Sequence, residues 1–202
     1  MAEGPAAAAW APMWRGIDEL ARLVGGYCWL EQRIFEITGS WATGPAGLRA
    51  DAPEQVVWCA AASRRHGARA RSWADRLPLR AGVDRAALVG SPSAALAAAV
   101  EALGAVRDGR EGITALVTAV LPRLRSAYGA HLASGSPVSE APVLEVLVRA
   151  DPELRDEIRD GGHLLAELPA ASPAVGEVAR ELGTAFERSF DSAGVFPAVR
   201  AS

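Results

Sequence analysis

The sequence predicts an all-α protein built as a helical bundle. Apolar residues recur with helical spacing through five long segments, which is the pattern of amphipathic helices packed on a common core. Clusters of glycine and proline separate these segments. Alternating β-branched residues never persist for more than a few positions, so no strand is expected.

Length and composition fit this fold and narrow the function classes. The chain has 202 residues, enough for one domain with a full-sized core. Half of the residues are hydrophobic and 22% are charged, which is the balance of a folded globular protein. The formal net charge of −3 gives no electrostatic reason to expect nucleic acid or a membrane surface as a partner, and no apolar run approaches the ~20 residues of a membrane span.

The first two predicted helices form a hairpin. The first covers residues 14–41 and ends before the turn-like stretch ATGPAG. The second begins with Pro53 in its first turn and Asp51 as its N-cap, and it stops before Pro78. Because the connection between them is short, the two helices are expected to run antiparallel.

A long connection, residues 78–110, follows this hairpin. It carries a short helix of its own, for which Ser91 and Pro92 supply the cap and the first-turn residue. A segment of this length allows the chain to return to the other end of the bundle before the next long helix begins.

Three further helices complete the prediction. The third long helix covers residues 111–132 and the fourth covers residues 139–168, joined by the break SGSP. Pro122 and Pro152 lie on the outer faces of these helices and are expected to bend them. A fifth, amphipathic helix covers residues 172–190 and could dock on this bundle or on a second chain.

Two antiparallel hairpins joined by one long crossover form the connectivity of ferritin-like four-helix bundles. This connectivity predicts a single domain over residues 14–192, with tails at 1–13 and 193–202. It also predicts that the first and fourth helices run in one direction and the second and third in the other.

Each of the four long helices carries a polar residue inside its apolar arc. A buried carboxylate or imidazole is disfavoured unless it is paired, so these residues are candidates for a site as well as for satisfied core positions. Counting turns places Glu31, His66 and Glu157 at a similar height in the middle of the bundle. Tyr128 is expected about two turns away, and His131 nearer one end. The candidate catalytic residues are Glu31, His66, Glu157 and Tyr128.

Three arginines lie at the borders of the inward faces and are candidates for holding an anionic substrate. They are Arg69 on the second helix, Arg123 on the third and Arg149 on the fourth. The alternative is that each arginine covers apolar surface with its stem while its charge stays in water.

Three stretches carry a resemblance to a known family: YCWLEQRIFEITGSWA, HGARARSWADRLP and DEIRDGGHLLAEL. They resemble the ferritin-like proteins encoded in actinobacterial natural-product gene clusters, over residues 20–168 of this chain. Metal-bearing members of that fold place a glutamate on one helix of each pair and Glu-x-x-His on the other. Glu31 matches the first glutamate and His66 the first histidine.

The chain departs from this ligand pattern at several positions. Ser63 stands where the glutamate paired with His66 belongs, and Asp160 follows Glu157 where histidine belongs. The third helix offers only apolar residues at the likely ligand positions: Val117, Val120 and Leu124. A di-metal centre is therefore not expected, and no cofactor is predicted.

Three functions remain open at this point. The first is a metal-independent enzyme that performs an elimination or cyclisation on a small anionic intermediate, with Glu31 or His66 as base. The second is a non-catalytic subunit that pairs with an active relative as a homodimer or heterodimer, for which the outward Trp29 suggests a contact surface. The third is an oxidase with one iron or manganese held by Glu31, His66 and Glu157. The two cysteines, Cys28 and Cys59, are expected to be buried thiols of a cytoplasmic protein.

Overall fold

The computed structural model describes residues 15–43, 52–79, 81–168 and 173–192, together with Gly194 and Phe196. Within these residues it contains helices and no strand, so the all-α prediction is confirmed. In chain order the elements are α1 (Ile17–Thr43), α2 (Pro53–Ala74), the 3-10 helix η1 (Arg85–Leu88), α3 (Ala94–Gly104), α4 (Gly109–Ala115), the π-helical η2 (Leu116–Val120), α5 (Leu121–Ser134), α6 (Ala141–Glu167) and α7 (Pro173–Ser192). None of the described helices is long and apolar enough to cross a membrane.

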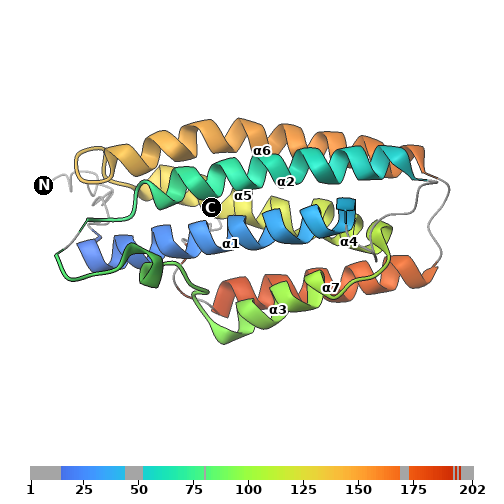
Figure 1. Cartoon of the computed structure of the whole chain (residues 1–202), viewed down its shortest axis with the longest axis horizontal. Helices are drawn as coiled ribbons and strands as arrows, with labels where there is room; N and C mark the ends of the chain where they lie inside the picture. The colour runs from blue at the N-terminus through green and yellow to red at the C-terminus, as the bar shows by residue number, and fades with distance from the viewer. Residues whose placement is uncertain are drawn as a thin grey trace, which may run out of the picture.

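The long helices lie side by side as a bundle (Figure 1). α1 packs along α2, α2 packs on α6, and α6 packs on α5. The colours in Figure 1 show that α1 and α6 run in one direction, whereas α2 and α5 run in the opposite one. α7 covers this bundle on the side of α3 and α4. The final amphipathic helix therefore docks on its own chain, through buried residues such as Phe186 and Phe190.

The third predicted helix is not continuous. A proline at position 122 has no N–H for the helical ladder, and the chain accommodates this with the π-helical segment η2 immediately before α5. The N–H of Leu121 donates to the carbonyl of Leu116, five residues earlier. Pro152, by contrast, lies inside α6, which continues on both sides of it.

The crossover between α2 and α4 contains η1 and α3. The predicted cap at Ser91 is wrong: Ser93 is the N-cap of α3, and its hydroxyl accepts from the N–H of Leu96. Asp51, the predicted cap of α2, lies outside the described residues. The tails predicted at 1–13 and 193–202 also lie outside them, apart from Gly194 and Phe196.

Two adjacent glycines seat the crossover on α1. A Cβ on Gly25 would overlap the carbonyl oxygen of Leu88, and a Cβ on Gly26 would lie 2.9 Å from the ring of Pro92. Glycine inside a helix costs about 1 kcal/mol relative to alanine, so this pair is explained by the close approach of η1 and the residues that follow it. The crossover thereby forms a wall against the middle of α1.

Candidate functional site

Four helices bring charged side chains together in the middle of the bundle. We call this group the central cluster; its members are Glu31 of α1, His66 and Arg69 of α2, Tyr128 of α5 and Glu157 of α6. Each of the five is buried, with no more than 4% of its surface exposed. The four residues predicted to be catalytic therefore do meet, although each comes from a different helix.

The Glu31 carboxylate lies at the heart of the central cluster. Its Oε1 accepts from Arg69 Nε at 2.9 Å and from the Tyr128 hydroxyl at 2.7 Å. Its Oε2 contacts His66 Nδ1. Tyr128, predicted about two turns away along the bundle, nevertheless reaches this carboxylate through its long side chain.

Arg69 is the residue whose place the sequence pattern misjudged. It does not lie at a border facing solvent but inside the cluster, where Nη2 donates to Glu157 Oε2 at 3.1 Å. Its Nη1 reaches the half-exposed carboxylate of Glu153 at 3.4 Å. The helical spacing of His66 and Arg69 explains the arrangement, since residues three apart share one face of a helix.

Each charge of the central cluster is balanced by another. Burial raises the pKa of Glu31, but Arg69, His66 and the hydrogen bonds from His66 and Tyr128 outweigh it and lower that pKa overall. Burial likewise opposes ionisation of Glu157, yet His66, Arg69 and Arg65 lower its pKa to about 2. Burial and Arg69 lower the pKa of His66, and the two carboxylates raise it by more. The cluster therefore favours two carboxylates beside the guanidinium of Arg69, and these carboxylates favour the protonated form of His66.

The network extends from Tyr128 into the aromatic core. The hydroxyl of Tyr128 accepts from Trp73 Nε1 at 2.9 Å while it donates to Glu31. Burial, followed by the charge of Glu31, raises the pKa of Tyr128 well above its usual value. Tyr128 is therefore a fixed hydrogen-bond donor and not a proton source at neutral pH.

The other two predicted substrate-binding arginines do not join the cluster. Arg123 pairs with Asp191 at 2.6 Å and lies over the ring of Phe190, so it fastens α7 to α5. Arg149 is exposed and lines a cavity of about 80 Å³ together with Arg69 and Glu153. This cavity contacts the central cluster through Arg69.

A second buried group of charges lies at the end of the bundle, where α5 gives way to α6. We call it the end cluster; it consists of Arg15, His131, Ser134 and Glu140. Arg15 Nη1 donates to Glu140 Oε2 at 3.1 Å, and His131 Nε2 lies 2.7 Å from the same oxygen. The sequence places His131 near one end but does not reveal its partners. Arg15 and Glu140 fall within the predicted helices 14–41 and 139–168, whereas in the structure they lie just before α1 and α6.

The fit of a metal ion can be tested from the donor groups. A single metal would use oxygens of Glu31 and Glu157 and a ring nitrogen of His66. Arg69 already donates to both carboxylates, so a cation occupies the position between them. Among the described residues no group of three or more His, Cys, Asp or Glu is arranged to hold a metal ion. In the described structure these donor groups are therefore engaged with one another and with Arg69.

The two cysteines are both free and buried, as expected. Burial raises the pKa of Cys59 to about 12, and burial together with the charge of Glu31 raises that of Cys28. Trp29 is not the outward contact residue that its helical position suggested, since it is partly buried against the core.

Comparisons with protein-family models, with curated proteins and with solved structures find no match. We therefore infer the function of the chain from the chemistry of its own side chains.

Proposed function

We propose that this chain is a metal-free ferritin-like bundle that acts as a non-catalytic subunit in secondary metabolism. In this proposal the guanidinium of Arg69 stands where a metal-bearing relative would hold its ions. The observation that carries it is the pair of bonds from Arg69 to Glu31, at 2.9 Å, and to Glu157, at 3.1 Å. One fixed guanidinium between two carboxylates offsets half of their charge, whereas a divalent metal ion would neutralise both, and it offers no open coordination position.

The helix directions support the ferritin-like part of this proposal. α1 and α6 run one way and α2 and α5 the other, as two hairpins joined by a crossover require. The chain's departures from the metal-ligand pattern agree with the same conclusion, since each lost ligand removes a reason to bind metal.

The closure of the central cluster supports a non-catalytic role. The side chains of Glu31, His66 and Glu157 are fully buried and already contact one another or Arg69. A substrate would have to break these bonds before it could use a carboxylate as a base. The proposed partner is a second bundle of the same kind, either another copy or an active relative.

The test is the metal content of the wild-type protein and of Arg69→Ala. Both are produced with added iron and manganese, purified without chelator and analysed for metal. We expect no stoichiometric metal in the wild type. In the variant we expect divalent metal to bind and to raise the melting temperature, because two carboxylates and an imidazole then lack their cation. One equivalent of iron or manganese in the wild type would overturn the proposal and support the oxidase.

A second candidate is the acid/base enzyme, and one observation favours it. The cavity of about 80 Å³ joins Arg69 to the exposed Arg149, so a small anion could reach the edge of the central cluster. A general base at neutral pH must be unprotonated. Nitrogen NMR of the His66 ring tests His66 as this base: a neutral imidazole at neutral pH favours the enzyme, whereas an imidazolium leaves Glu31 as its only candidate base.

A further inference from the structure

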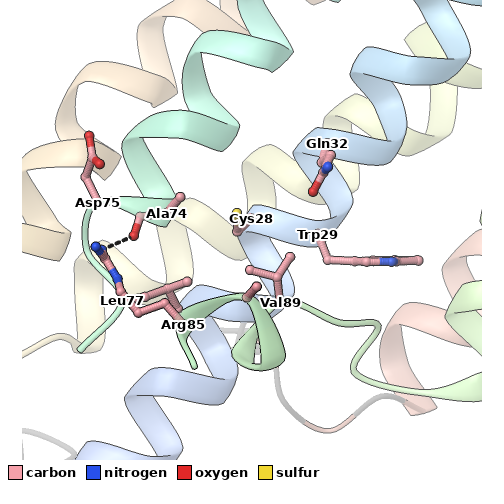
Figure 2. A pocket seen from close by; sticks show the side chains of 9 residues that line it. Cys28, Trp29, Gln32, Ala74, Asp75, Leu77, Arg85 and Val89 are labelled. Atoms are coloured by element: carbon pink, nitrogen blue, oxygen red, sulfur yellow. Dashed lines mark hydrogen bonds between the residues drawn. The ribbon is translucent and has the colours of Figure 1, made fainter. Parts of the chain in front are cut away.

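A cavity lies away from the central cluster, on the crossover side of α1. It has a volume of about 510 Å³, within the range of small-molecule sites. Figure 2 shows side chains from α1, from the end of α2 and from η1 arranged around it. Its lining residues are Cys28, Trp29, Gln32, Ala74, Asp75, Leu77, Arg85, Ala86 and Val89.

The guanidinium of Arg85 is held in place at this cavity, but one of its N–H donors has no acceptor among the described residues. The guanidinium of Arg85 donates through Nη2 to the carbonyl of Ala74, as the dashed line in Figure 2 marks. Its Nε is buried and has no hydrogen-bond partner among the described residues. A buried donor without an acceptor costs free energy, so an acceptor supplied by a ligand would be favourable. A carboxylate suits this position because it adds opposite charge to the hydrogen bond.

The remaining walls define the rest of the ligand. Trp29, Leu77 and Val89 present apolar surface, which favours a ring or a branched hydrocarbon. Gln32 offers an amide to a polar substituent. The exposed carboxylate of Asp75 also lines the cavity and would repel a second negative charge.

We propose that this cavity binds a small apolar monocarboxylic acid, with its carboxylate on Arg85 and its hydrocarbon body against Trp29, Leu77 and Val89. The proposal goes beyond the subunit role and does not depend on the central cluster. The hydrogen bond of Arg85 goes to the carbonyl of Ala74, which is not a member of that cluster. Cys28 forms part of the lining and is 4% exposed, so a ligand in the cavity would cover its thiol.

The test uses naphthoate and its uncharged amide, naphthamide, as probes in isothermal titration calorimetry. We expect the acid to bind the wild type about tenfold or more tightly than the amide. Arg85→Met should abolish this preference because it keeps the apolar stem and removes the charge. Arg155→Met, which changes an exposed arginine on α6, is the matched control and should leave both affinities unchanged.

A second variant keeps the test independent of local misfolding in Arg85→Met. Val89→Trp narrows the cavity and keeps Arg85, and it should weaken binding of both probes while circular dichroism stays unchanged. Equal affinity for acid and amide, or unchanged binding in Val89→Trp, would each overturn the proposal, and so would the absence of any binding.

Discussion

The central and end clusters are both buried and each contains an arginine, a histidine and a glutamate, yet they act on their histidines in opposite ways. His66 faces two carboxylates, whereas His131 shares Glu140 with Arg15. Burial lowers the pKa of both imidazoles. The pKa of His66 is nevertheless raised and that of His131 is lowered overall. The comparison teaches that burial disfavours the charged form of both histidines, and that the ratio of carboxylates to permanent cations determines whether this cost is overcome, as it is at His66 and not at His131.

Removing Arg69 should have the largest effect, because it leaves two buried carboxylates with only His66 and the partly exposed Arg65 to balance them. We expect Arg69→Met to lower the free energy of unfolding by about 3–5 kcal/mol. Urea denaturation followed by circular dichroism measures this loss. Arg155→Met, at an exposed pair, should stay within about 0.5 kcal/mol of the wild type. A similar small loss for both variants would show that Arg69 is not essential to the cluster.

The second-largest effect should be the loss in the free energy of unfolding at acid pH. The pKa of Glu157 is about 2 in the folded protein against its usual 4.5, so its ionised form favours folding. This contribution is complete above about pH 4.5 and is lost as the pH falls towards 2. Glu157→Gln should therefore be less stable than the wild type near neutral pH and should lose less stability across this acid window. Denaturation curves at several pH values test this; parallel losses in the two proteins would contradict it.

The sequence carries enough information for the helices and for the identity of four cluster residues. Helical periodicity reports which face of a helix is inward, so Glu31, His66, Tyr128 and Glu157 could be found before their contacts were known. The same periodicity gives the direction of each side chain around the helix axis, but not how far that side chain extends. Periodicity therefore does not show that the Tyr128 hydroxyl reaches Glu31, or that the Arg69 side chain turns from the border of its helix into the cluster.

The rest depends on packing that no single helix encodes. Arg15 and Glu140 flank helices and meet only because α1, α5 and α6 end together. The wall of the large cavity exists because η1 approaches Gly25 closely, a contact between segments far apart in the sequence. The break at η2 follows from Pro122, but periodicity alone could not show that a π-helical segment would absorb it.

The two histidines themselves should titrate apart. We expect the pKa of His66 above its usual 6.5 and that of His131 below it, measured by proton or nitrogen NMR. Protonated His66 contributes stability that is complete below pH 6.5 and is lost as the pH rises through its raised pKa.

Removing the arginine of the end cluster should reverse the direction of the pKa change at His131. Arg15→Met leaves Glu140 to His131 alone, so the pKa of His131 should rise while that of His66 stays unchanged. If His131 keeps its low pKa in this variant, the ratio of carboxylates to cations is not what separates the clusters.

The smallest effect should distinguish two buried tyrosines that lie edge to face, 4.8 Å apart. Tyr128 bonds both Glu31 and Trp73, whereas the hydroxyl of Tyr27 has no partner among the described residues. Tyr128→Phe should cost about 1–3 kcal/mol, because it removes a donor from a buried carboxylate and the acceptor of an indole N–H. Tyr27→Phe keeps the ring and its packing and discards only an unused hydroxyl, so it should be neutral or slightly stabilising. Thermal and urea denaturation of the two variants compare them directly. Equal losses would mean that packing of the ring, and not the hydrogen bond to Glu31, is what Tyr128 contributes to the central cluster.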